Sequence, residues 1–266
     1  MSSIRKILVP VALSPACAWA ARHSASLATQ LGAELLFVHV ADQSAARELE
    51  RFLHREIPGA ACRSIVLTGD PADSIVAYAA EQTCDLIVMP THAYGRFRRF
   101  LLGSVTSKVL HDADCPVWTG VHHQDAPFSD QATIRSVVCA VDLSPNCIPV
   151  ICWAQNLAGC FQAVLKVIHA EPAADETSDN AGEIELRHHL FRRAQAKFEG
   201  WCGPAGLKIE IEQHGGSVAQ VVREAVLRER ADVVVIGRGH AQGTLGRLRT
   251  GAYGIIRDSP CPVLSI

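Results

Sequence analysis

Cysteine and histidine are the residue types in this chain best suited to catalysis or metal binding, and it has 10 and 12 of them. No two cysteines have C-x-x-C spacing, and several lie in apolar stretches (Cys17, Cys62, Cys139, Cys152), which predicts buried, reduced thiols. The histidine pairs at 122–123 and 188–189 stand in polar stretches without cysteines or carboxylates at ligand spacing. We therefore expect neither a disulfide framework nor a metal site built from these residues.

Hydroxyl and thiol side chains recur at matching places, but no catalytic constellation accompanies them. Ser104 and Thr250 have no histidine or lysine base at a recognisable spacing, and no partner recurs beside both Cys115 and Cys261. His39 has a counterpart in His169 near the end of an apolar run, where a hydrogen-bonded structural histidine is more common than a base. The sequence predicts a protein that is not an enzyme.

The chain contains the same unit twice. Residues 85–117 read DLIVMPTHAYGRFRRFLLGSVTSKVLHDADCPV, and residues 232–263 read DVVVIGRGHAQGTLGRLRTGAYGIIRDSPCPV. An acidic residue, an apolar run, a loop rich in glycine and arginine, a helical pattern and Cys-Pro-Val recur in order. The apolar runs 86–89 and 233–236 are typical of strands buried on both faces of a parallel sheet, and ligands of such sheets bind at the loops that follow.

Helix and strand patterns alternate through both copies. In the first copy, strands are expected at 4–11, 35–40 and 62–67, and Ser14-Pro15 and Gly32 bound the first helix. The apolar positions of a later helix (Ala72, Ile75, Val76, Ala79, Ala80) recur 146 positions on (Val218, Val221, Val222, Ala225, Val226), and we interpret this as the repeat of that helix. The earlier parts match at an offset of 130, so an insertion is expected at 171–182, a polar, acidic stretch that indicates a mobile loop.

This order predicts an α/β protein of two tandem flavodoxin-like or Rossmann-like domains, each a five-stranded parallel, doubly wound sheet. The predicted boundaries are 1–120 and 133–266, joined by a linker at 121–132. Each copy ends in a short strand after Cys-Pro. We expect these last strands to pair the two domains as an intramolecular pseudo-twofold unit, since exposed edges are usually covered. A homodimer of such chains is a second possibility.

The net charge and the lengths of the apolar runs limit the kinds of partner that we expect for this protein. Formal net charge is −2, so no strong field attracts nucleic acid, and we expect no such partner. No apolar run approaches the roughly 20 residues of a membrane span, and residues 1–6 lead directly into a strand pattern rather than a signal peptide. We expect a cytoplasmic protein without membrane contact.

The order ILVPVALSP, GAELLFVHV, TGDPADSIVAYA, DLIVMPTH and LLGSVTSKVLHDADCPV resembles the universal stress protein family, and residues 133–266 resemble a second such domain. The resemblance covers nearly the whole chain. It implies the adenine nucleotide α hydrolase-like fold. Many members bind ATP through G-x-x-G-x(9)-G-[S/T] after the fourth strand, with an aspartate after the first strand, while others bind no nucleotide. Glycines there let backbone amides approach phosphate oxygens at a helix N-terminus.

The first copy keeps only part of this motif. Gly103 and Ser104 match its third glycine and hydroxyl, whereas Pro90 and Ala12 stand at the first glycine and the aspartate. Ala93 occupies the second glycine position, and Gly95 is close enough to take over the turn. Proline has no N–H to donate, so the resemblance implies a damaged site.

The second copy is closer to intact. Asp142 fills the aspartate position, Gly237 the first glycine and Thr250 the hydroxyl, while Gly239 adds flexibility. His240 and Arg249 replace the other two glycines, and Gly251 substitutes for the last one if the register slips by one. By resemblance, a bound ATP or other adenine nucleotide is therefore expected mainly here. We expect no metal beyond a magnesium ion that accompanies the nucleotide, and at most slow, incidental ATP hydrolysis.

Two functions stay open from the sequence. One is a stress-response protein that binds ATP or another adenine nucleotide at the second-copy site. The other is an interaction or scaffold protein of the same fold that binds no nucleotide. A third, a hydrolase of the related adenine-nucleotide group, would need an SGG-type loop after the first strand, which VALSP and VDLSP do not supply.

Overall fold

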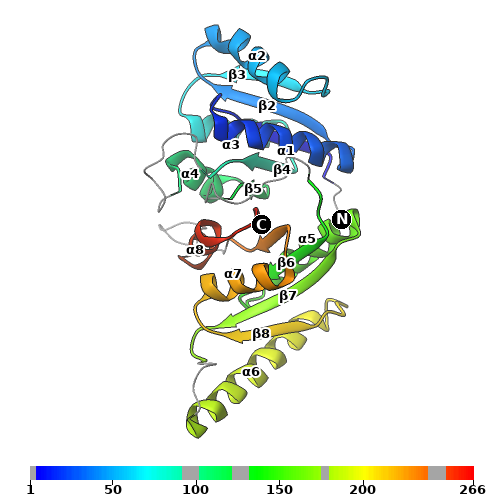
Figure 1. The fold of residues 1–266 in the computed structure, drawn as a ribbon, viewed down its shortest axis with the longest axis vertical. Helices are drawn as coiled ribbons and strands as arrows, with labels where there is room; N and C mark the ends of the chain where they lie inside the picture. Colours follow the sequence, from blue (N-terminus) through cyan, green and yellow to red (C-terminus); the bar gives the residue numbers. More distant parts are fainter. Residues whose placement is uncertain (1–3, 92–101, 122–131, 175–179, 239–249) are drawn as a thin grey trace. The chain divides into compact units, whose positions relative to one another are not determined.

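The computed structural model describes residues 4–91, 102–121, 132–174, 180–238 and 250–266, with the side chain of Thr250 excepted. The chain divides into two compact units at residues 133 and 134. Each is α/β, as the alternating pattern predicts, and each is described on its own below. Figure 1 labels their helices and strands.

Unit 1 is a parallel sheet in the strand order β3-β2-β1-β4-β5. Its helices pack in two pairs, α1 with α2 and α3 with α4, as right-handed crossovers on opposite faces require. The elements are β1 (Lys6–Pro10), α1 (Pro15–Leu31), β2 (Glu34–Val40), the short 3₁₀ helix η1 (Gln43–Ala45), α2 (Ala46–Glu56), β3 (Arg63–Leu67), α3 (Pro71–Glu81), β4 (Leu86–Met89), α4 (Ser104–Asp112) and β5 (Val117–Thr119).

Unit 2 repeats this order as β10-β9-β6-β7-β8. Its elements are β6 (Ser136–Ala140), α5 (Cys147–Phe161), β7 (Val164–Glu171), α6 (Ala181–Cys202), β8 (Ile211–Gly215), α7 (Val218–Glu229), β9 (Val233–Ile236), α8 (Thr250–Asp258) and β10 (Val263–Ser265). The central strands β4 and β9 are buried at every position, as their apolar runs predict. No described helix is long and apolar enough to cross a membrane.

Local signals in the sequence place the helix ends. Ser14 accepts the N–H of Cys17 and Pro15 opens α1, while Gly32 ends it with φ of +66°. Asp70 accepts the N–H of Asp73 at the start of α3. The caps at Ser14 and Gly32 confirm the expected boundaries of the first helix.

The repeat of α3 in α7 is offset by 147 positions, and the expected 146 is wrong. The N-cap residues Asp70 and Ser217 correspond, as do Thr83 and Arg230, which have φ of +51° and +48° just past the two helices. Ala80, one of the expected core positions, is exposed. The adjacent apolar pairs in α7 are compatible with an offset of 146 or of 147, so the cap residues decide between the two offsets.

Two other expectations also need correction. Cys62 is exposed, because it lies just before β3 rather than inside the sheet, and Cys152 is half-buried. All ten cysteines are free. The stretch 171–182 is not one loop. Glu171 ends β7, Asn180 caps α6, and Ala181 begins that helix; residues 175–179 lie outside the described part.

An aspartate before the fourth strand of each unit holds the start of the first strand. Oδ2 of Asp85 accepts the N–H groups of Arg5 (2.8 Å) and Lys6 (3.0 Å). Oδ2 of Asp232 accepts those of Arg135 (2.7 Å) and Ser136 (3.0 Å). The recurring acidic residue of the sequence is therefore structural, because each carboxylate satisfies two backbone donors that have no strand partner.

We expect Asp232→Ala to lower the free energy of unfolding of unit 2 by about 1–3 kcal/mol, since two amides lose a charged acceptor. Urea denaturation followed by circular dichroism measures the change. Asp232→Asn keeps one oxygen and should lose less. Equal losses in the two variants would contradict this account.

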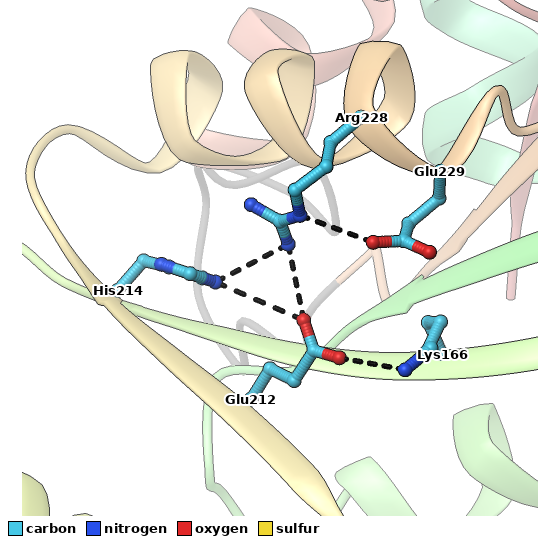
Figure 2. A network of polar contacts seen from close by, with 5 residues as sticks. All are labelled: Lys166, Glu212, His214, Arg228 and Glu229. Carbon is cyan, nitrogen blue, oxygen red and sulfur yellow. Dashed lines mark hydrogen bonds and ion pairs between the residues drawn. The ribbon is translucent and has the colours of Figure 1, made fainter.

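A polar network between the sheet and α7 belongs to unit 2 alone (Figure 2). Glu212 lies 2.9 Å from Nζ of Lys166 and 3.0 Å from a guanidinium nitrogen of Arg228, with His214 beside it. The strand registers put Leu36 and Ile65 of unit 1 at the places of Lys166 and Glu212. The hydrogen bond and charge of Lys166 lower the pKa of Glu212, and Arg228 and His214 add to that effect.

Because the folded-state pKa of Glu212 is depressed, its contribution is complete above the pKa of the unfolded state, about 4.3. It is lost as pH falls through the folded-state value. Glu212→Gln should therefore destabilise the protein at pH 7, by less than about 1 kcal/mol because the pair is partly exposed, and the difference should vanish in acid. Denaturation from pH 3 to 7 measures it. Glu210→Gln, two residues earlier and exposed, is the matched control and should show no such trend.

Candidate ligand site in unit 2

A cavity of about 340 Å³ lies in unit 2 at the carboxyl ends of β6, β7 and β9. This is the edge of a parallel sheet at which ligands of such folds bind, and the volume is at the lower end of the usual range for small-molecule sites. Three of the predicted site residues line it together: Asp142, Gly237 and Gly251. The lining is otherwise mainly apolar, with Val150, Val218 and Ile255 among its walls.

Asp142 is held by the turn that follows β6. Its Oδ1 accepts the N–H of Ser144 at 3.0 Å, and the side chain remains exposed. Leu143 between them has φ of +54°, a conformation that costs a branched residue free energy, and it is buried. Leu13 repeats it with φ of +55° in unit 1. The turn therefore belongs to the fold, and unit 2 uses it to present a carboxylate.

Glycine is needed at one of the predicted positions by packing. A Cβ on Gly237 would lie 3.1 Å from Cγ2 of Val150 on α5, closer than ordinary contact. At Gly251, in the first turn of α8, a Cβ would meet nothing nearer than 3.9 Å and would project from a residue that lines the cavity. The start of α8 thus reaches the cavity without a side chain in the way.

His169 and Cys147 also line the cavity, and the sequence did not assign them to it. Nδ1 of His169 is 2.9 Å from the carbonyl oxygen of Val141. Because a carbonyl can only accept, Nδ1 donates the hydrogen of this bond, and Nε2 lies 4.0 Å from a carboxylate oxygen of Glu171. His39 makes the same bond to Val11 at 2.7 Å, which confirms the structural role predicted for both histidines.

The thiol at the cavity is not a nucleophile at neutral pH. Burial, followed by the nearby Cys202 and Asp142, raises the pKa of Cys147 to about 11. The protonated thiol is a small apolar wall. Among the described residues there is also no group of three side chains able to hold a metal ion.

The corresponding part of unit 1 is arranged differently. Ala12 replaces the aspartate, and its N–H points to the sulfur of Cys17 at 3.2 Å. The N–H of Gly103 donates to the carbonyl oxygen of Thr91 at 2.9 Å, so this amide is already engaged. Ser104 is exposed at the start of α4. That the nucleotide motif of unit 1 is damaged stays a prediction.

Some predicted site residues lie outside the described part of the chain: Gly95, Gly239 and the side chain of Thr250. Arg96, Arg98, Arg99, Arg247 and Arg249 of the two loops lie outside it as well, whereas Arg238 is described and buried. The roles at phosphate that the resemblance implies for the glycines and the Thr250 hydroxyl stay predictions.

The family model for the universal stress protein family matches residues 3–51, 42–119 and 133–266, and so nearly the whole chain. The chain belongs to the universal stress protein family. It contains two such domains in tandem, as its repeat predicts.

Curated relatives and solved structures agree. A universal stress protein of Methanocaldococcus jannaschii is 31% identical over an alignment of 135 residues that covers 42% of this chain and 79% of that protein. One from Methanothermobacter thermautotrophicus is 39% identical over 90 residues, 34% of this chain and 54% of that protein. A universal stress protein structure from Archaeoglobus fulgidus covers 99% of this chain and 96% of its own, with a TM-score of 0.69 at 20% identity, and so supports the fold.

Proposed function

We propose that this universal stress protein binds ATP or another adenine nucleotide in unit 2 and works as a binding protein rather than as an enzyme. The observation that supports it is the cavity that brings Asp142, Gly237 and Gly251 together. A carboxylate suits the hydroxyls of a ribose or the amine of adenine, and the apolar walls suit the base. The glycines leave room for a phosphate near the start of α8.

Binding without catalysis follows from the same side chains. The described lining offers the buried thiol of Cys147 with its raised pKa, and a histidine whose Nδ1 is bonded to a backbone carbonyl. Neither side chain forms a nucleophile and base pair with the other lining residues that the structure describes. The pairing of the two units as an intramolecular pseudo-twofold unit, and a homodimer of the chain, stay predictions that small-angle scattering can test.

We expect unit 2 to bind ATP more tightly than unit 1. Asp142→Asn is the sharp variant, because an amide oxygen can still accept the N–H of Ser144 and keep the turn. Loss of a hydrogen bond to the charged group should weaken binding by about 1.5–3 kcal/mol, which is roughly ten- to a hundredfold in Kd. Isothermal titration calorimetry with the full chain measures it.

Ser104→Ala, in the first turn of α4, is the control and should leave the Kd within about twofold of the wild-type value. Equal losses in both variants would indicate two comparable sites. No heat from the wild-type protein at millimolar ATP would contradict the proposal and favour an interaction protein without a nucleotide.

A further inference from the structure

Helix α6 is the element in which the two repeats differ most. It has 22 residues, whereas its counterpart α2 has 11. Each helix packs a phenylalanine into its unit, and Phe52 is seventh in α2 while Phe198 is eighteenth in α6. The additional residues therefore form extra turns at the amino-terminal end. Unit 1 covers its own sheet edge without such turns.

The extra turns are not needed to cover the core of unit 2. The buried residues of α6 are Ala194, Phe198 and Cys202, all in its second half. From Ala181 to Arg193 no residue is buried. Figure 1 shows this end of α6 diverging from β8. Ile184, Arg187, Leu190 and Phe191 are half-buried there, so the fold recovers only part of the conformational cost of ordering these turns.

One exposed stripe follows the whole length of α6 beside its buried face. Residues 186, 190, 193, 197 and 201 are three or four positions apart, so they share one side of the helix over about 22 Å. The stripe consists of Leu186, Leu190, Arg193, Lys197 and Trp201. Leu186 is 49% exposed and Trp201 is 40% exposed, the rest of the stripe being exposed or half-buried.

The stripe has apolar residues near both ends and two cations between them. Arg193 and Lys197 form no ion pair with any residue in the described part of the chain, although their helix contains several glutamates. Tryptophan and arginine are the side chains most enriched among the residues that dominate binding at protein interfaces. The pattern of anchors at four-residue spacing is that of a helix that docks along another helix.

We propose that this stripe of α6 is a docking surface for an acidic amphipathic helix of another protein. Glutamates or aspartates in the middle of that helix would pair with Arg193 and Lys197, and apolar residues on both sides would contact Leu186 and Trp201. A second copy of this chain fits poorly, because an antiparallel pair of α6 stripes would bring Arg193 against Arg193.

A charge-swap experiment with the full chain tests the proposal. The probe is a helical peptide of about 18 residues with leucines near both ends of one face and glutamates between them; its counterpart has lysines instead. We expect the acidic peptide to bind at least about tenfold more tightly than the basic one by fluorescence anisotropy. Arg193→Glu with Lys197→Glu should reverse that preference.

Arg192→Glu is the matched control, since Arg192 is exposed on a different side of the same helix. It should keep the preference for the acidic peptide, and circular dichroism checks that all variants fold. Equal affinity for both peptides, or an equal effect of the control and the double variant, would overturn the proposal. So would binding to phosphatidylglycerol vesicles without binding to the peptide, or self-association through α6 in sedimentation velocity.

Discussion

The placement of the site depends on the carboxylate that bridges the starts of two parallel strands. Asp232, the residue before β9, accepts hydrogen bonds from two backbone amides at the start of β6. Val137 to Ala140 of β6 then lie in register with Val233 to Ile236 of β9. Because both strands begin and end together, the loops that follow them open at the same edge. Asp142 and Gly237 are neighbours in the cavity for this reason. Asp85 fixes the same register in unit 1.

The fold could be predicted from the sequence because its signals are local and repeated. Apolar runs predict the central strands, and caps such as Ser14 and Gly32 predict where helices end. The exact register of the repeat was harder. Val221 with Val222, and Ala225 with Val226, form adjacent apolar pairs that tolerate a shift by one residue, so periodicity alone could not choose. Only the cap residues and the residues with positive φ angles distinguish an offset of 146 from one of 147.

The lining of the cavity was predicted in part for the same reason. Asp142 and Gly237 stand at positions that the family resemblance marks, whereas Gly251 enters the motif only if its register slips by one residue. His169 and Cys147 come to the cavity through packing of β7 and α5 around β6, and no spacing in the sequence marks that approach. The φ of +54° at Leu143 is equally invisible, because leucine is not a residue type that favours this region.

Duplication lets unit 2 differ from unit 1 at the proposed ligand site and at the proposed docking surface while both keep the same fold. Unit 1 has the short helix α2 over its sheet. It shows the shortest helix at this place with which the fold is stable. The additional turns of α6 in unit 2 exceed that minimum, so the stability of the core does not account for them. Polar composition at 171–182 suggested a loop, yet the extra length continues as α6, whose hydrogen-bonded turns keep Leu186 and Arg193 on one side. A loop of the same composition could not hold that spacing, so the helical form is itself the argument for recognition.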